Sequence, residues 1–212
     1  MMTYHLLDFP SGRGTSIAVA RNIISKDLCR DFIQKIEPLP VFQEGRTIGG
    51  YKPSVKKCWD VDFNKQTFDS FNVSFDGFEK YYEEFNIGLA SAVQMYLEDF
   101  PFLKAAPVLR TTDLHLQKYE RNTGFYTVHD DGNPWDVGSD RTLGIIIYLN
   151  DVALGGETLF PEQRLRLKGL AGDIALFPAN WTHPHCGAFP LSGDKWIFSV
   201  FLKTERSPLI KV

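Results

Sequence analysis

His129, Asp131 and a later histidine have the types and the spacing of a metal site. His129 and Asp131 are two positions apart in a segment predicted to be a strand, and residues two apart in a strand point to the same face. A histidine from a distant strand would complete a set of two histidines and one carboxylate, which leaves open positions on a non-haem Fe(II) ion. The sequence offers His183 and His185 for this third position. The first pair alone carries little weight, because a surface strand readily holds both residue types.

Lys195 is a candidate partner for an anionic ligand of the same site. It follows His185 by ten positions and opens the apolar segment KWIFSVFL, in which it shares a face with Ile197 and Ser199. A lysine whose ammonium points among apolar groups needs an anionic partner. A small dicarboxylate between Lys195 and the metal would supply that partner. Tyr148 lies in another apolar strand, where its hydroxyl would reach either the same carboxylate or a backbone carbonyl.

Two segments with helical periodicity precede these residues. Ser25 is placed to cap a helix over residues 26–37. A longer helix is predicted over residues 76–100, where Asp76 and Glu79 have the spacing of a capping box. The aromatic-rich apolar stripe of this second helix is expected to pack on a sheet. The helices therefore read as a supporting layer.

The remaining segments predict strands and loops. Residues 1–24 are expected to give one or two edge strands, whereas residues 41–74 show no sustained period and predict either surface loops or a lid near the site. Beyond Pro107, short strand-like segments alternate with turn residues, which is typical of a sandwich or barrel such as a jelly roll. The predicted strands are residues 109–119, 125–131, 141–149, 157–160, 164–168, 173–177, 182–186 and 195–203.

The whole-chain composition is that of an ordinary globular protein. The 212 residues suit one domain, and 43% of them are hydrophobic and 23% charged. A net charge of -3 gives no basic field for nucleic acid. Three cysteines without a CxxC spacing argue for a reduced compartment. Neither a signal peptide nor an apolar stretch of roughly 20 residues is evident, so we expect a cytoplasmic location without membrane or nucleic-acid partners.

A series of motifs runs in order through the second half of the chain. They are Tyr119, the segment His129-Asp-Asp131, Arg141-Thr-Leu, Tyr148-Leu-Asn, Gly155-Gly-Glu-Thr-Leu-Phe-Pro161, Gly172-Asp, Phe177-Pro178, and His185 followed by Lys195-Trp196. In this order they resemble the 2-oxoglutarate and Fe(II)-dependent dioxygenases of the prolyl 4-hydroxylase type. The resemblance covers roughly residues 108–204.

The resemblance implies an α+β, mainly β fold. A double-stranded β-helix, or jelly roll, would be backed by N-terminal helices. Residues 1–212 would form a single domain, with residues 1–107 as helical support and loops and residues 108–205 as the catalytic core.

The same resemblance implies the ligands of the iron and of the co-substrate. His129, Asp131 and His185 correspond to the iron ligands, and Lys195 corresponds to the residue that pairs with the distal carboxylate of 2-oxoglutarate. The ten-residue offset from Lys195 favours His185 over His183 as the third ligand.

Further residues correspond to pocket positions. Tyr148 and Tyr119 would line the 2-oxoglutarate site. Arg141 would lie near the pocket mouth and meet a substrate, or would form a structural ion pair with a nearby aspartate. Trp135 and Trp196 are candidates for lining a substrate groove, although either could be a packing residue.

The implied reaction is hydroxylation of a C–H bond, in the first place of a peptidyl proline. It would consume molecular oxygen and 2-oxoglutarate, release succinate and CO2, and use ascorbate as a reductant. Asp131 favours hydroxylation over halogenation, because halogenating relatives lack this carboxylate. Pro190 follows His185 by five positions, where many prolyl hydroxylases have four. The substrate therefore stays open to another protein side chain, a free amino acid or another small molecule.

Two readings of a different class remain. One is a non-enzymatic ligand-binding jelly roll, and the other is a zinc hydrolase, since two histidines and an aspartate also suit zinc. Neither of them requires an anion-binding group at Lys195.

Overall fold

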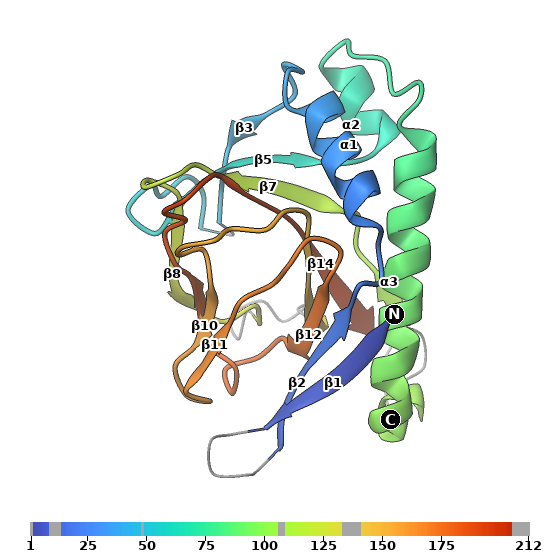
Figure 1. Ribbon diagram of the computed structural model, residues 1–212, viewed down its shortest axis with the longest axis vertical. Coiled ribbons are helices and arrows are strands. Elements are labelled where there is room, and N and C mark those ends of the chain that lie inside the picture. The colour runs from blue at the N-terminus through green and yellow to red at the C-terminus, as the bar shows by residue number, and fades with distance from the viewer. Residues whose placement is uncertain (1, 9–13, 48, 106–108, 133–140, 205–212) are drawn as a thin grey trace, which may run out of the picture.

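Two antiparallel sheets and a layer of helices make up the computed structural model of the protein (Figure 1), which describes residues 2–8, 14–47, 49–105, 109–132 and 141–204. The larger sheet runs in the order β1 (Thr3–Asp8), β2 (Gly14–Arg21), β12 (Ile174–Pro178), β9 (Arg141–Tyr148), β14 (Lys195–Thr204), β7 (His115–Tyr119), β5 (Trp59–Asp62) and β3 (Gln43–Glu44), and β6 (Leu109–Thr111) pairs with β14. The smaller sheet runs in the order β11 (Leu165–Leu167), β10 (Thr158–Phe160), β13 (His185–Gly187), β8 (Phe125–His129) and β4 (Lys56–Lys57).

The helices lie on the outer side of the larger sheet (Figure 1). They are α1 (Lys26–Ile36), α2 (Lys65–Ser70) and α3 (Glu79–Asp99), followed by the 3-10 helix η1 (Pro101–Ala105). The predicted double-stranded β-helix backed by N-terminal helices is therefore the observed fold. Among the described residues, no helix has the length and apolarity needed to cross a membrane.

Strand β14 separates two apolar cores because its side chains alternate between the two faces of the sheet. Phe198 is fully buried against the helices, with its ring centroid 4.9 Å from Phe85 and 5.5 Å from Phe32. Ile197 belongs to the second core, which lies between the two sheets. This alternation gives the sheet one face for scaffold packing and one face for the interior of the barrel.

The start of α3 differs from the predicted capping box. The helix begins at Glu79, and its N-cap residue Phe78 makes no side-chain cap. The Glu79 carboxylate instead accepts a hydrogen bond from Gly77 N at 2.7 Å, and the N–H of Asp76 donates to Ser74. Gly77 has φ of +77°, a conformation that a right-handed helix does not contain. The helix therefore starts after Gly77 instead of at residue 76.

Residues 41–74 contain short strands and a helix in addition to the predicted loops. They contribute β3, β4, β5 and α2. Strand β5 pairs with β7 of the larger sheet, and β4 pairs with β8 of the smaller sheet. The N-terminal part of the chain is therefore more than helical support, because it supplies strands to both sheets. The single strand predicted over residues 109–119 is observed as two strands, β6 and β7.

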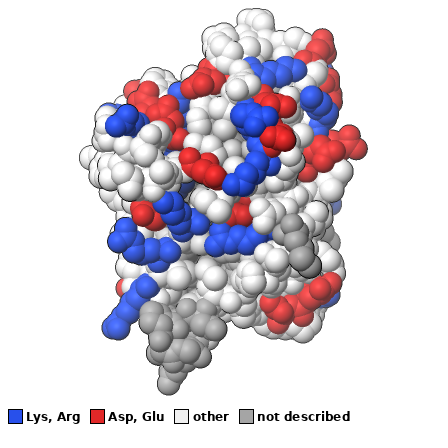
Figure 2. Space-filling view, in the orientation of Figure 1, with Lys and Arg blue, Asp and Glu red and all other residues white. Residues whose placement is uncertain are grey.

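Charged residues of both signs are interspersed on the surface, as Figure 2 shows for one face. Two ion pairs link the ends of α1 to the strands and loops beside it. Lys26 lies 2.9 Å from Asp151, and Lys118 of β7 lies 2.8 Å from Glu37. Such solvent-exposed pairs contribute about 0–1 kcal/mol each, so apolar packing is the main stabilising term for the helix layer.

Phe198→Ala is expected to lower the free energy of unfolding by about 3–5 kcal/mol, because it removes a fully buried ring from the contact between sheet and helices. Urea-induced unfolding followed by circular dichroism is the measurement. Phe102→Ala is the matched control, since Phe102 is 70% exposed, and it should change the free energy by less than about 0.5 kcal/mol. Equal losses in both variants would contradict the role of Phe198 in the core.

Candidate functional site

Two paired strands bring His129 and His185 together. His129 ends β8 and His185 begins β13, and the two residues are directly opposite each other in the antiparallel ladder. Asp131 lies between them, with its carboxylate oxygens 3.7 Å from His129 Nε2 and 3.6 Å from His185 Nε2. The potential ligand atoms of these three residues all lie within 4.8 Å of one another. Within the part of the chain that the structure describes, these three residues form the cluster whose ligand atoms are close enough together to hold a metal ion.

Strand alternation does not place Asp131 beside His129, contrary to the sequence-based argument. Strand β8 ends at His129, and Asp131 lies beyond it, where the chain bends. Arg141 Nη1 donates a hydrogen bond to the Asp131 carbonyl at 3.0 Å. Gly144 makes room for the carboxylate, since a Cβ there would lie 2.6 Å from Asp131 Oδ2 and 2.5 Å from Phe177. Tertiary contacts with β9 therefore position this carboxylate.

The hydrogen bonds of the two histidines leave their Nε2 atoms free to bind a metal. Nδ1 of His129 lies 2.8 Å from Thr127 O, and Nδ1 of His185 lies 3.2 Å from His183 O. A carbonyl oxygen only accepts, so each Nδ1 carries the proton and each Nε2 presents a lone pair. Backbone carbonyls commonly orient metal-binding histidines in this way.

Burial favours the neutral form of both imidazoles. It lowers the pKa of His129 and the pKa of His185 to about 4. Burial also raises the pKa of Asp131. Two unprotonated Nε2 atoms and a carboxylate converge without a donor between them, and this donor set fits a divalent cation such as Fe(II).

The three residues lie in the wall of a cavity of about 650 Å³. Lys195 lines the same cavity and is 5% exposed. No hydrogen bond or ion pair joins its Nζ to any described residue. The ring centroids of Tyr148 and Tyr119 lie 5.6 and 5.9 Å from Nζ, and the charge of Glu157 acts on it from outside ion-pair distance. Burial lowers the pKa of Lys195 to about 8. A buried ammonium without a partner is unfavourable, so this part of the cavity suits an anionic group.

The predicted face of β14 is confirmed. Lys195, Ile197, Ser199 and Phe201 all line the cavity. The guanidinium of Arg141 also lines it and lies 3.7 Å from the Phe201 ring. Arg141 bonds to the Asp131 backbone carbonyl. Asp136 and Asp140 lie outside the described residues, so both predictions for Arg141 stay open.

The predicted tyrosines differ in how they reach the cavity. Tyr119 lines it and donates its hydroxyl to Gln117 at 2.9 Å. The Tyr148 hydroxyl lies 2.9 Å from Thr158 Oγ1, and it is Thr158 that lines the cavity. Gly169 lies so close to the Tyr148 ring that an added Cβ would be 2.2 Å from it. Sequence reasoning missed Thr158 and Gln117, although Thr158 opens an otherwise apolar strand.

The assignment of Trp196 to the substrate groove is wrong. Trp196 is the next residue after Lys195, so its side chain points to the opposite face of β14. It is 4% exposed and packs with Phe42, whose ring centroid is 5.7 Å away, and with Lys118 at 5.1 Å. Trp135 lies outside the described residues.

His183 is held by other groups and is not part of the metal-binding set. Its Nε2 lies 2.7 Å from Thr15 O, and its Nδ1 lies 2.7 Å from Thr182 Oγ1. With both ring nitrogens engaged, His183 connects its loop to β2. This geometry agrees with the preference for His185.

Sequence reasoning also missed a charged cluster in the cavity wall. Lys56 is 3% exposed and pairs with Asp60 at 3.2 Å. His115 lies between Asp60 and Asp62, at 3.3 and 2.7 Å. Burial alone would lower the pKa of His115, but its hydrogen bonds with the two aspartates raise it. No sequence period marked these residues, because they come from three short strands.

Residues 114–203 match the family model described as the 2OG-Fe(II) oxygenase superfamily. A protein of Acanthamoeba polyphaga mimivirus, provisionally named a prolyl 4-hydroxylase, is 32% identical over 77 residues. That match covers 32% of this chain and 32% of the relative, so it spans about a third of the relative's length.

Solved structures of low sequence identity share the fold. The viral collagen prolyl hydroxylase of Paramecium Bursaria Chlorella virus-1, in its 2OG complex, is 15% identical with a TM-score of 0.64, covering 90% of this chain and 97% of that one. A Trichoplax adhaerens prolyl hydroxylase in complex with a hypoxia inducible factor peptide fragment is 12% identical with a TM-score of 0.65, covering 90% and 84%. A Pseudomonas putida prolyl-4-hydroxylase is 12% identical with a TM-score of 0.62, covering 91% and 94%.

The family match over residues 114–203 and the shared double-stranded β-helix agree with the resemblance that the ordered motifs carry.

Proposed function

We propose that this protein is an Fe(II)- and 2-oxoglutarate-dependent dioxygenase that hydroxylates a C–H bond of a peptidyl proline and releases succinate and CO2. One observation carries the proposal: the Nε2 atoms of His129 and His185 and the carboxylate of Asp131 converge in the wall of a cavity that also contains the unpaired ammonium of Lys195. A zinc hydrolase or a non-enzymatic jelly roll would explain the two histidines and the aspartate but not the buried ammonium of Lys195.

His129, Asp131 and His185 would hold the iron and leave its other positions open. Iron and 2-oxoglutarate, when bound, supply oxidative decarboxylation coupled to hydroxylation, and ascorbate would serve as a reductant. The chain's own task is to orient the ligands and exclude water from the buried end of the cavity. The Nδ1 bonds of both histidines support that orientation.

Lys195 would pair with the distal carboxylate of 2-oxoglutarate. Its burial supports this role, as does the lack of a hydrogen bond or ion pair from its Nζ to any described residue. Thr158, with Tyr148 behind it, is placed to donate a hydroxyl hydrogen bond to the same region, and Tyr119 contributes an aromatic wall. The proposal therefore assigns Tyr148 to supporting Thr158.

A peptidyl proline is the proposed substrate because the structural relatives named above are prolyl hydroxylases, one of them with a bound peptide fragment. The spacing between His185 and Pro190 favours a second candidate, in which the same chemistry acts on another side chain, a free amino acid or a small molecule. Arg141 lines the cavity and is the proposed substrate contact among the described residues. A cytoplasmic location and a single domain over residues 1–212 remain predictions.

Anaerobic addition of Fe(II) and 2-oxoglutarate is expected to give a weak visible charge-transfer absorption. The band should be lost in His129→Ala, Asp131→Ala and His185→Ala, because each removes a proposed ligand. His183→Ala should retain it, as should His5→Ala, a control on the exposed side of β1. A band that survives in His129→Ala and Asp131→Ala would contradict the ligand assignment.

Lys195→Ala is expected to raise the 2-oxoglutarate concentration needed for half-maximal turnover by about 30-fold or more, because truncating one partner of a buried charge pair costs about 2–5 kcal/mol. Iron binding should be nearly unchanged. Thermal unfolding of the metal-free variant should occur no earlier than in the wild type, since an unpaired buried ammonium is removed. Lys203→Ala, on the same strand but outside the cavity lining, is the matched control. Equal loss of iron and 2-oxoglutarate binding would point to misfolding.

Succinate production should rise when proline-containing peptides are added, and mass spectrometry should then show a gain of one oxygen on proline. Free proline and a whole-cell peptide extract are run in parallel. Oxygen gain on a different residue or on a free amino acid would contradict peptidyl proline as the substrate but would support the proposed hydroxylation. Failure of every substrate to stimulate succinate release would count against the enzyme proposal.

A further inference from the structure

The ring of Tyr126 stacks directly on the imidazole of His129. Their centroids are 3.5 Å apart and their planes differ by 15°. Both residues belong to β8, three positions apart. Side chains three apart in a regular strand point to opposite faces, so the stack requires an irregular strand.

A β-bulge in β8 provides that irregularity. Opposite β8, His185 pairs with His129 and Gly187 pairs with Tyr126, so three steps along β8 match two steps along β13. The extra residue turns Thr127 and Val128 outward together, and Val128 is 57% exposed. Bulges of this kind re-aim side chains and are frequent beside active sites. Here the bulge brings Tyr126 and His129 to the same face.

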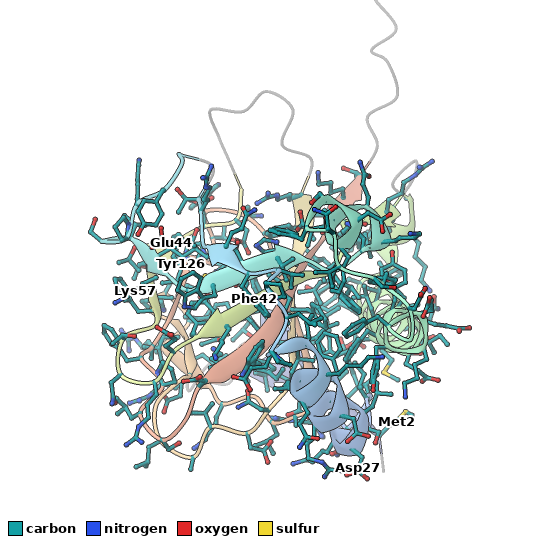
Figure 3. All side chains as sticks on the ribbon, turned by 90° about the horizontal axis from the view of Figure 1, so that it is seen from above. Met2, Asp27, Phe42, Glu44, Lys57 and Tyr126 are labelled. Atoms are coloured by element: carbon teal, nitrogen blue, oxygen red, sulfur yellow. The ribbon has the colours of Figure 1, made fainter. Side chains whose placement is uncertain are left out.

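Neighbouring strand β4 holds the tyrosine ring. Lys56 is directly opposite Tyr126 in the ladder between β4 and β8, and its Nζ lies 5.6 Å from the ring centroid. Lys56 itself is anchored by Asp60 at 3.2 Å and by the carbonyl of Arg46 at 3.3 Å. Figure 3 labels Lys57 of β4 and Tyr126 of β8, the two strands that pair here. The ring is thus confined by groups that are themselves fixed.

The two histidines differ in what encloses them. His185 is packed by Phe177 and Phe160, with ring centroids 4.7 and 5.5 Å away. His129 lies at the end of its strand, and its side chain is 17% exposed. Among the described residues, two rings contact His129: that of His185, which is tilted, and that of Tyr126, which is stacked. Tyr126 therefore supplies for His129 the wall that two phenylalanines supply for His185.

We propose that Tyr126 is a positioning residue of the metal centre, which acts through the imidazole of His129. Its ring fixes the plane of that imidazole, so that Nε2 stays directed toward Asp131 while Nδ1 donates to Thr127 O. The inference rests on the proposed function, because it takes His129 as a metal ligand. The aromatic ring of Tyr126, and not its hydroxyl, carries the effect.

The test measures binding of Co(II) alone to the metal-free protein, by calorimetry and by the Co(II) absorption spectrum. Tyr126→Leu should weaken binding about tenfold or more, as loss of an orienting partner does in other metal sites, whereas Tyr126→Phe should stay within about twofold of the wild type. Phe125→Leu is the matched control on the same strand, since its ring packs with Phe189 at 5.1 Å, away from the histidines. Circular dichroism checks that all variants are folded.

Three outcomes would overturn this inference and leave the proposed function standing. Unchanged Co(II) affinity in Tyr126→Leu would show that the stack does not position His129. An equal loss in Tyr126→Phe would assign the effect to the hydroxyl, and an equal loss in Phe125→Leu would reflect general loosening of β8. His129→Ala separates the two levels of the proposal: unchanged Co(II) binding in this variant would remove the ligand assignment, and with it both proposals.

Discussion

The antiparallel pairing of β8 with β13 is the constraint on which the site depends. It sets His129 opposite His185, although the two residues are far apart in the chain. The bulge in β8 adjusts that register, and the bend after β8 returns Asp131 toward both imidazoles. A one-residue slip of the pairing would turn every side chain of a strand to the other face. The ligand set therefore depends on backbone register as much as on residue type.

The larger sheet keeps the opposite wall of the cavity rigid. Its outer face is covered by an aromatic cluster around Phe198, Phe32 and Phe63, all fully buried. Its inner face carries Lys195 into the cavity from the same strand that carries Phe198 outward. Because close-packed interiors deform little, the helix layer holds the ammonium in place without touching the cavity. The N-terminal segment contributes in a second way, since β4 and β5 join the walls of the site.

Several side chains in the cavity are in environments that weaken their charged forms. Burial lowers the pKa of Lys195 to about 8 and raises the pKa of Asp131. Groups of this kind reduce the stability of the isolated fold, and natural proteins retain them mainly at functional sites. Lys56 is also buried, but it forms an ion pair with Asp60 inside the wall. Lys195 is thus a buried charge available to a ligand, whereas Lys56 is a buried charge that is already paired within the protein.

Residue types and periodicity predicted a mainly β fold with supporting helices, and the resemblance carried by the ordered motifs added the site of His129, Asp131, His185 and Lys195, because helical and strand periods and motif offsets can be read along one chain. The tertiary structure alone decided which groups surround them. Trp196 faces the core because it follows Lys195 by one position in β14, and Thr158, Gln117, Lys56 and Tyr126 enter the cavity from separate strands. The bulge, the bend after β8 and the space at Gly144 arise from pairing and packing between distant segments, and such contacts leave no local period in a sequence.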